Sequence, residues 1–74
     1  MSKRQTVPEI SREELICLIN QWIVGRHAER NRNIMIRRLA DGICFEPLAE
    51  EFDLSVRHIK EIVYKCEYII FRHI

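Results

Sequence analysis

Residues 45–63 of this 74-residue chain read FEPLAEEFDLSVRHIKEIV, a pattern that predicts two helices joined by a tight turn. Phe45-Glu46-Pro47 suits the first turn of a helix, because proline there lacks only a backbone donor that has no partner in any case. The apolar residues before the break recur at helical spacing: Leu48, Ala49 and Phe52. Asp53-Leu54 is a tight break, and Ser55 is suited to cap a second helix. The buried stripe of that helix should consist of Ile59, Ile62, Val63, Cys66, Ile69 and Ile70.

Two further helices are predicted upstream. Ser11 and Glu14 form a capping box, which places a helix from Ser11 or Arg12 to about Val24, with Gly25 as its stop. A second helix should span roughly His27–Ala40. Asp41-Gly42 should end it, because glycine readily adopts the left-handed conformation that closes a helix.

The composition supports a single helical domain. Hydrophobic residues make up 47% of the chain and charged residues 31%, and only two glycines and two prolines interrupt it. We therefore expect an all-α fold: a four-helix domain over residues 10–74, preceded by a flexible N-terminal tail over residues 1–9. No strand pattern is visible. The predicted core contains Leu18, Trp22, Leu39, Leu48, Ala49, Phe52, Leu54, Ile59 and Ile62.

Several classes of protein are disfavoured. No apolar run approaches the roughly 20 residues of a membrane span, and Met1–Gln5 lacks the apolar stretch of a signal peptide, so we expect a cytoplasmic protein. We expect no enzyme, small-molecule substrate or cofactor, because there is no phosphate-binding glycine loop or nucleophile motif, and so short a chain should not enclose a pocket of the usual few hundred Å³. The odd number of cysteines argues against a disulfide framework. Without a Cys-x-x-Cys pair, buried or half-buried thiols are favoured over a metal site for Cys17, Cys44 and Cys66.

The net charge is only +1, but the charges are segregated along the chain. Residues 26–38 contain five arginines and one glutamate, whereas residues 41–53 contain five acidic side chains and no basic one. Residues 55–74 are basic again, with four basic and two acidic side chains. Such segregation sets the local field that a polyanion meets.

Residues 44–71 resemble the helix-turn-helix of bacterial regulators. The match lies in apolar Leu48 and Phe52, small Ala49 where the helices cross, Leu54 in the turn and the Ser55 cap. With the upstream stretch RRLADG of residues 37–42, the likeness covers about residues 27–71 and is similar to region 4 of sigma-70-type factors and the small regulators related to it. In that family glycine usually occupies the turn. Asp53 stands there, and aspartate is among the few other residues that tolerate a positive φ.

The resemblance implies sequence-specific binding of double-stranded DNA by the last helix, in a bacterial or phage transcriptional regulator. A recognition helix directs its N-terminal residues toward base edges. The implied contact residues are Ser55, Val56, Arg57, His58, Lys60 and Glu61. Phosphate contacts are expected from Arg30, Arg37, Arg38 and Lys65. The recognition helix of the family opens with a denser basic run than Val56-Arg57-His58.

Alternatives remain open at this point. The basic side chains of the last helix would also suit an ordinary solvated face, and the arginines of residues 26–38 would equally suit ion pairs with the acidic third helix. The competing function is a protein-interaction module that uses the same scaffold to dock on RNA polymerase or another regulatory protein. Tyr64, Tyr68 and Phe71 give the last helix an apolar surplus, which either packs on the first helix or forms a homodimer face.

Overall fold

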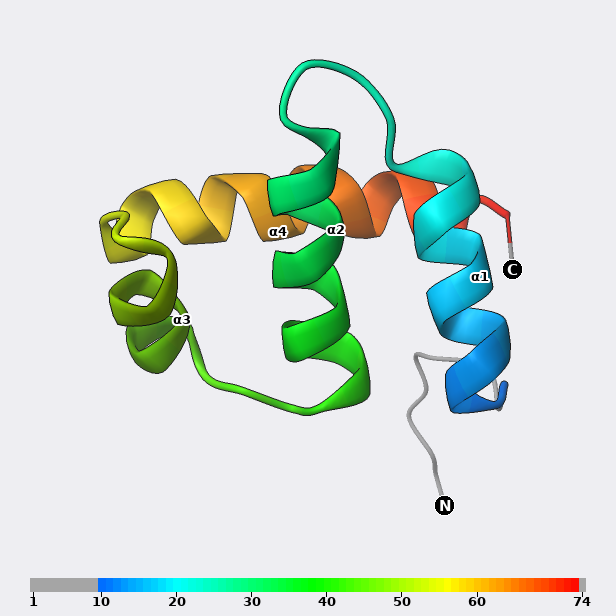
Figure 1. Cartoon of the computed structure of the whole chain (residues 1–74), viewed down its shortest axis with the longest axis horizontal. Coiled ribbons are helices and arrows are strands. Elements are labelled where there is room, and N and C mark those ends of the chain that lie inside the picture. Colours follow the sequence, from blue (N-terminus) through cyan, green and yellow to red (C-terminus); the bar gives the residue numbers. More distant parts are fainter. Residues whose placement is uncertain (1–9, 74) are drawn as a thin grey trace.

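The longest helix of the structure is α4, Val56–Phe71, and the other helices pack on it. The computed structural model describes residues 10–73, so the tail predicted for residues 1–9 lies outside the described residues. These residues form α1 (Arg12–Trp22), α2 (Ala28–Met35), a π-helical segment η1 (Ile36–Ala40), α3 (Phe45–Phe52) and α4, and they contain no strand. The predicted all-α class is confirmed. In Figure 1, α2 crosses the middle of α4, with α3 near the start of α4 and α1 near its end.

The start of α1 has the predicted capping box. The Glu14 backbone N–H donates to Ser11 Oγ, and the Ser11 backbone N–H donates to Glu14 Oε1, each over 3.0 Å. The helix ends at Trp22, two residues before the expected Val24, and Gly25 follows with a φ of 111°. The backbone N–H groups of Ser11 and Glu14, which have no partner within the helix, therefore both find an acceptor in the capping box.

The helix expected over His27–Ala40 is present but changes its winding. From Ile36 onward each hydrogen bond joins residues that are further apart in the sequence. The Asp41 N–H, for example, donates to the Ile36 carbonyl, five residues back. This is the spacing of a π-helix. Gly42, at a φ of 72°, then turns the chain toward α3, as predicted.

The connection between α3 and α4 is tight. Asp53 has φ 57° and ψ 46°, which is the left-handed conformation expected for it. The Leu54 N–H donates to the Ala49 carbonyl over 2.9 Å, which satisfies a carbonyl at the end of α3. Ser55 Oγ accepts from the His58 N–H over 3.0 Å and caps α4. The start of α4 is thus held in a fixed place against α3.

The core lies where α4 meets the other helices. Ala49 is 7% exposed and Ile59 is fully buried, as the predicted crossing of α3 and α4 requires. Other predicted core residues pack against the core while remaining partly exposed: Leu18, Leu39, Phe52 and Leu54. The largest fully buried side chains are Ile19, Ile34, Met35, Leu48, Ile59, Ile70 and Val63. Among residues 10–73, no helix is long and apolar enough to cross a membrane.

Two predictions of burial were wrong. Trp22 is 37% exposed, and its ring stacks on the imidazole of His73 with the centroids 3.7 Å apart. Trp22 therefore lies beside the buried stripe of α1, which consists of Leu15 and Ile19 and continues at Ile23. All three cysteines were expected to be buried or half-buried, but Cys17 and Cys44 are exposed and Cys66 alone is buried.

Candidate nucleic-acid interface

The N-terminal half of α4 presents a polar surface. Its inner side is held in the core by Ile59 and Ile62, so the intervening residues face solvent. The side chain of Arg57 is 90% exposed, and its Nε lies 3.6 Å from Glu61 Oε2, one turn along the helix. An exposed pair of this kind contributes little stability. Both side chains can therefore exchange this contact for one with a ligand.

A basic patch lies along one edge of this surface and is centred on the Phe45 ring. Arg38 Cζ is 4.3 Å from the ring centroid, and Lys60 Nζ is 5.6 Å from it. Arg38 also donates from Nη1 to the Ile43 carbonyl over 3.0 Å, which fixes the guanidinium. Glu67 is the nearby acid: burial raises the pKa of its carboxyl, and the charge of Arg38 opposes that rise. The structure thus brings together Arg38 and Lys60, which are 22 positions apart in the sequence.

A groove lies along the other edge, between α4 and the start of α2. Its volume is about 340 Å³, and it is lined by Arg30, His58, Glu61 and Lys65, among others. The structure therefore gathers four of the predicted contact residues here. A pocket of a few hundred Å³ was not expected in so short a chain. The groove has such a volume, but it is an open groove between helices.

His27 also lines the groove and was missing from the predicted site. It is the residue before α2 and makes no capping hydrogen bond with its side chain. A histidine between Arg26 and Arg30, in the most basic part of the chain, is the sequence signal that would have pointed to it.

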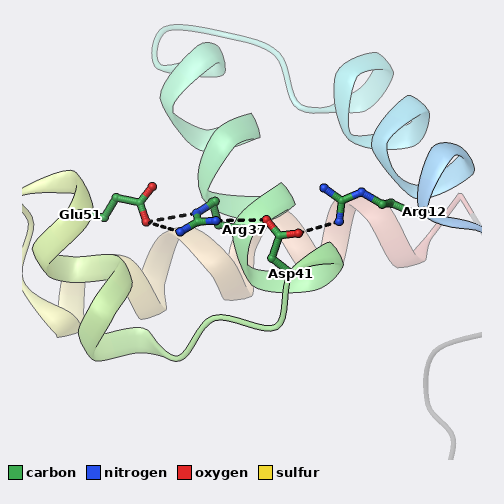
Figure 2. Close-up of polar contacts among 4 residues, drawn as sticks. All are labelled: Arg12, Arg37, Asp41 and Glu51. Carbon is green, nitrogen blue, oxygen red and sulfur yellow. Dashed lines mark hydrogen bonds and ion pairs between the residues drawn. The ribbon is translucent and has the colours of Figure 1, made fainter.

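Arg37 is engaged differently from the other predicted phosphate contacts. Its Nη2 lies 3.1 Å from Glu51 Oε1, and its Nη1 lies 3.3 Å from Asp41 Oδ2. Asp41 also accepts from Arg12, over 2.6 Å, so four side chains form a row of alternating charge from α3 to α1 (Figure 2). The hydrogen bond to Glu51 raises the pKa of Arg37, and the one from Arg12 lowers the pKa of Asp41. Arg37 thus forms an ion pair with the acidic helix α3, which was one of the two alternatives that the sequence left open for the arginines of residues 26–38.

Within residues 10–73, no three side chains of the His, Cys, Asp and Glu types gather as metal ligands would. The α4 surface is a helix face that exposes an arginine, a lysine and a glutamate, with basic side chains along both edges.

No protein-family model, curated protein or solved structure matches this chain. What distinguishes the chain is therefore the geometry of α3 and α4 and the side chains that they expose.

Proposed function

We propose that this chain binds double-stranded DNA sequence-specifically, with α3, the turn at Asp53 and α4 acting as a helix-turn-helix. The observation that supports it best is the combination of a left-handed turn at Asp53 with Ala49 and Ile59 buried between the two helices. That packing holds α4 rigidly by its inner side while its N-terminal outer side stays in solvent. A transcriptional regulator of bacterial or phage type, similar to sigma-70 region 4, is the role that suits such a module.

In the proposed complex, α4 lies in the major groove. A helix with its side chains is about 10–12 Å across, and the groove is about 12 Å wide. Arg57 is the residue for base recognition, because its exposed guanidinium can donate to both acceptors of a guanine. Glu61 can accept from a cytosine amine, and Val56 can contact a thymine methyl group. Ser55 and the first backbone N–H groups of α4 meet a phosphate.

Phosphate contacts fall to the two edges of α4. Lys60 and Arg38 serve one strand, and Arg30, His58 and Lys65 serve the other. Because these groups are clustered, the net charge of +1 is no obstacle to a local attraction for DNA. The proposal carries with it a cytoplasmic location, no catalytic activity, and binding as a homodimer on two half-sites or together with RNA polymerase.

The test compares Arg57→Ala with Arg72→Ala, which removes an exposed arginine at the other end of α4. A preferred duplex would first be selected from a random pool. Arg57→Ala should weaken binding to that duplex by about 1–3 kcal/mol while barely changing binding to scrambled DNA, because only base edges differ between sequences. Arg72→Ala should preserve the discrimination. Fluorescence anisotropy at several salt concentrations gives both values.

The second candidate function is docking on another protein. It is favoured by three aromatic side chains that α4 leaves exposed: Tyr64, Tyr68 and Phe71. Tyr68 is 68% exposed, and the guanidinium of Arg72 lies 5.5 Å from its ring centroid. If no duplex binds more tightly than about 100 μM at low salt, where even nonspecific binders reach that range, the DNA proposal is wrong and this surface becomes the better candidate.

A further inference from the structure

The outer side of α4 changes character along its length. Its N-terminal half is polar, whereas its C-terminal half exposes three aromatic rings about one helical turn apart, the aromatic row: Tyr64, Tyr68 and Phe71. With a rise of about 1.5 Å per residue, the two tyrosines are displaced by about 6 Å along the helix axis. Both tyrosines are more than half exposed, so most of each ring is free to contact a ligand.

Cationic side chains lie at both ends of the aromatic row. At the first end, the ring of Tyr64 meets the ring of Phe45 edge to face, with the centroids 6.0 Å apart. Arg38 and Lys60 lie over that Phe45 ring, as described above. At the other end, Arg72 lies over the ring of the second tyrosine. No carboxylate within residues 10–73 forms an ion pair with any of these three cations.

The acidic side chains near the aromatic row leave this positive charge in excess. Glu61 and Glu67 are the two acids within one helical turn of the tyrosines. Glu61 forms its ion pair with Arg57, toward the start of α4. Glu67 is partly buried and feels the charge of Arg38. Exposed aromatic rings between cations suit a ligand that combines flat apolar groups with negative charge.

We propose that the aromatic row binds a single-stranded nucleic acid, whose bases stack on the exposed rings while Arg72 and Lys60 contact its phosphates. Stacking of bases on aromatic side chains beside a cationic path is the general way in which proteins hold a single strand. A duplex does not suit these rings, because its bases are stacked on one another about 3.4 Å apart. The rings are separated by about 5–6 Å along the helix, which matches bases that have come apart.

This inference goes beyond the binding of duplex DNA and does not rest on it. Recognition of a duplex is assigned to the N-terminal half of α4 around Arg57, whereas the aromatic row occupies the C-terminal half. The same rings are the surface of the alternative function, docking on another protein. The cations at both ends of the row favour a polyanion as its occupant.

The test measures the binding of the full chain to a labelled oligothymidylate of about 12 nucleotides, by fluorescence anisotropy. Tyr68→Ala should weaken binding by about 5- to 100-fold, as the loss of one stacked base implies. Tyr68→Phe keeps the ring and should bind like wild type. Because Tyr68 is exposed, both variants should also keep the melting temperature of wild type. An oligouridylate of the same length shows whether RNA, with its 2′-hydroxyl groups, is preferred to DNA.

Arg72→Ala tests the phosphate contact separately. It should weaken binding and reduce the slope of log affinity against log salt concentration by about 0.7, the value for one phosphate of a single strand. Arg26→Ala is the matched control, because it removes an exposed arginine that precedes α2 and lies outside the row. This control should change neither the affinity for oligothymidylate nor its salt dependence.

Three results would overturn the inference. The first is no binding of either oligonucleotide at low salt. The second is equal affinity of wild type and Tyr68→Ala, which would leave only nonspecific attraction between charges. The third is a dimer of the chain, detected by sedimentation, that Tyr68→Ala dissociates without changing the affinity for the strand. Arg57→Ala should leave single-strand binding unchanged, so a failure of the duplex proposal is distinguishable from a failure of this one.

Discussion

Asp53 adopts the left-handed conformation on which the turn between α3 and α4 depends. It is the only residue other than glycine within 10–73 that has a positive φ, at 57°. The left-handed conformation costs an ordinary L-residue about 1–2 kcal/mol, and aspartate is among the few that tolerate it. The position of α4 relative to α3 therefore depends on one backbone conformation.

Substitution of Asp53 should follow backbone preference rather than side-chain size. Asp53→Gly should leave the free energy of unfolding within about 1 kcal/mol of wild type, because the relief of strain is offset by the greater entropy of the unfolded chain. Asp53→Val should destabilise by about 1–2 kcal/mol, because a β-branched residue is strongly disfavoured at positive φ. Urea unfolding gives both values, and equal stabilities for the two variants would show that the turn is not strained.

Ala49 should not accept a larger side chain. It is buried where α3 meets α4, so Ala49→Leu should force the helices apart and cost about 1–3 kcal/mol. Glu50→Leu places the same side chain on the exposed side of the same helix, where the effect should stay within about 0.5 kcal/mol. Thermal unfolding of the two variants is the comparison. A melting temperature for Ala49→Leu that matches Glu50→Leu would rule out a close crossing at this residue.

Among the elements, α1, η1 and α3 are connected by the row of charges Arg12, Asp41, Arg37 and Glu51 (Figure 2). Each pair is exposed, so each contributes modestly and is screened by salt. The row nevertheless fixes which way Arg37 points, toward Asp41 and Glu51.

Acid should weaken this connection in a predictable direction. The hydrogen bond from Arg12 lowers the folded-state pKa of Asp41, so the carboxylate stabilises the fold above its unfolded pKa of about 3.9. That contribution is lost as the pH falls through the lower, folded-state value. Asp41→Asn should therefore be less stable than wild type near pH 6 and converge with it in acid. Urea titrations across this range, repeated in high salt to screen the pairs, would measure it. A constant difference at all pH values would contradict the assignment.

The helices were predictable from sequence because their start and stop signals are local. Ser11 with Glu14, Ser55 and Asp41-Gly42 each lie within a few residues of the boundary that they set. The exposure of Trp22 was not predictable, because the apolar residues of α1 outnumber those that the core covers, and the sequence does not show that Leu15, Ile19 and Ile23 form the buried stripe. Nor was the π winding, which depends on how Ile36–Ala40 packs between α1 and α3.

The candidate site was only partly predictable for a similar reason. The exposed residues of α4 follow from its periodicity, whereas the positions of the arginines follow from tertiary contacts. Arg30, Arg37 and Arg38 are close in sequence, yet the groove holds the first, an ion-pair row the second and the Phe45 ring the third. His27 was missed because its neighbours in the sequence mark a basic segment but do not show that α4 passes beside it.

At the scale of the whole molecule, α4 contacts α1, α2 and α3, so its inner side should become accessible only when the fold opens. The reactivity of the three cysteines would measure how often the inner side of α4 becomes accessible. Cys17 and Cys44 are exposed, whereas Cys66 is buried, and that burial raises the pKa of its thiol. A thiol reagent should therefore modify two cysteines quickly in the native protein and Cys66 only at the rate of unfolding. Mass spectrometry of peptides after timed labelling gives the three rates. Rapid labelling of Cys66 would mean that α4 detaches without global unfolding.

The π-helical segment has a consequence for the ancestry of this chain. A π turn holds about one residue more than an α turn, so it is what a regular helix becomes when a single amino acid is inserted and the flanking helices are kept. Removal of one residue from 36–40 should restore α winding, and the residues after it should keep their places around the helix axis. Asp41 should then still face Arg12, and the path to α3 should be kept. An alignment of this chain with a regular-helix relative should therefore have a one-residue gap between Ile36 and Ala40.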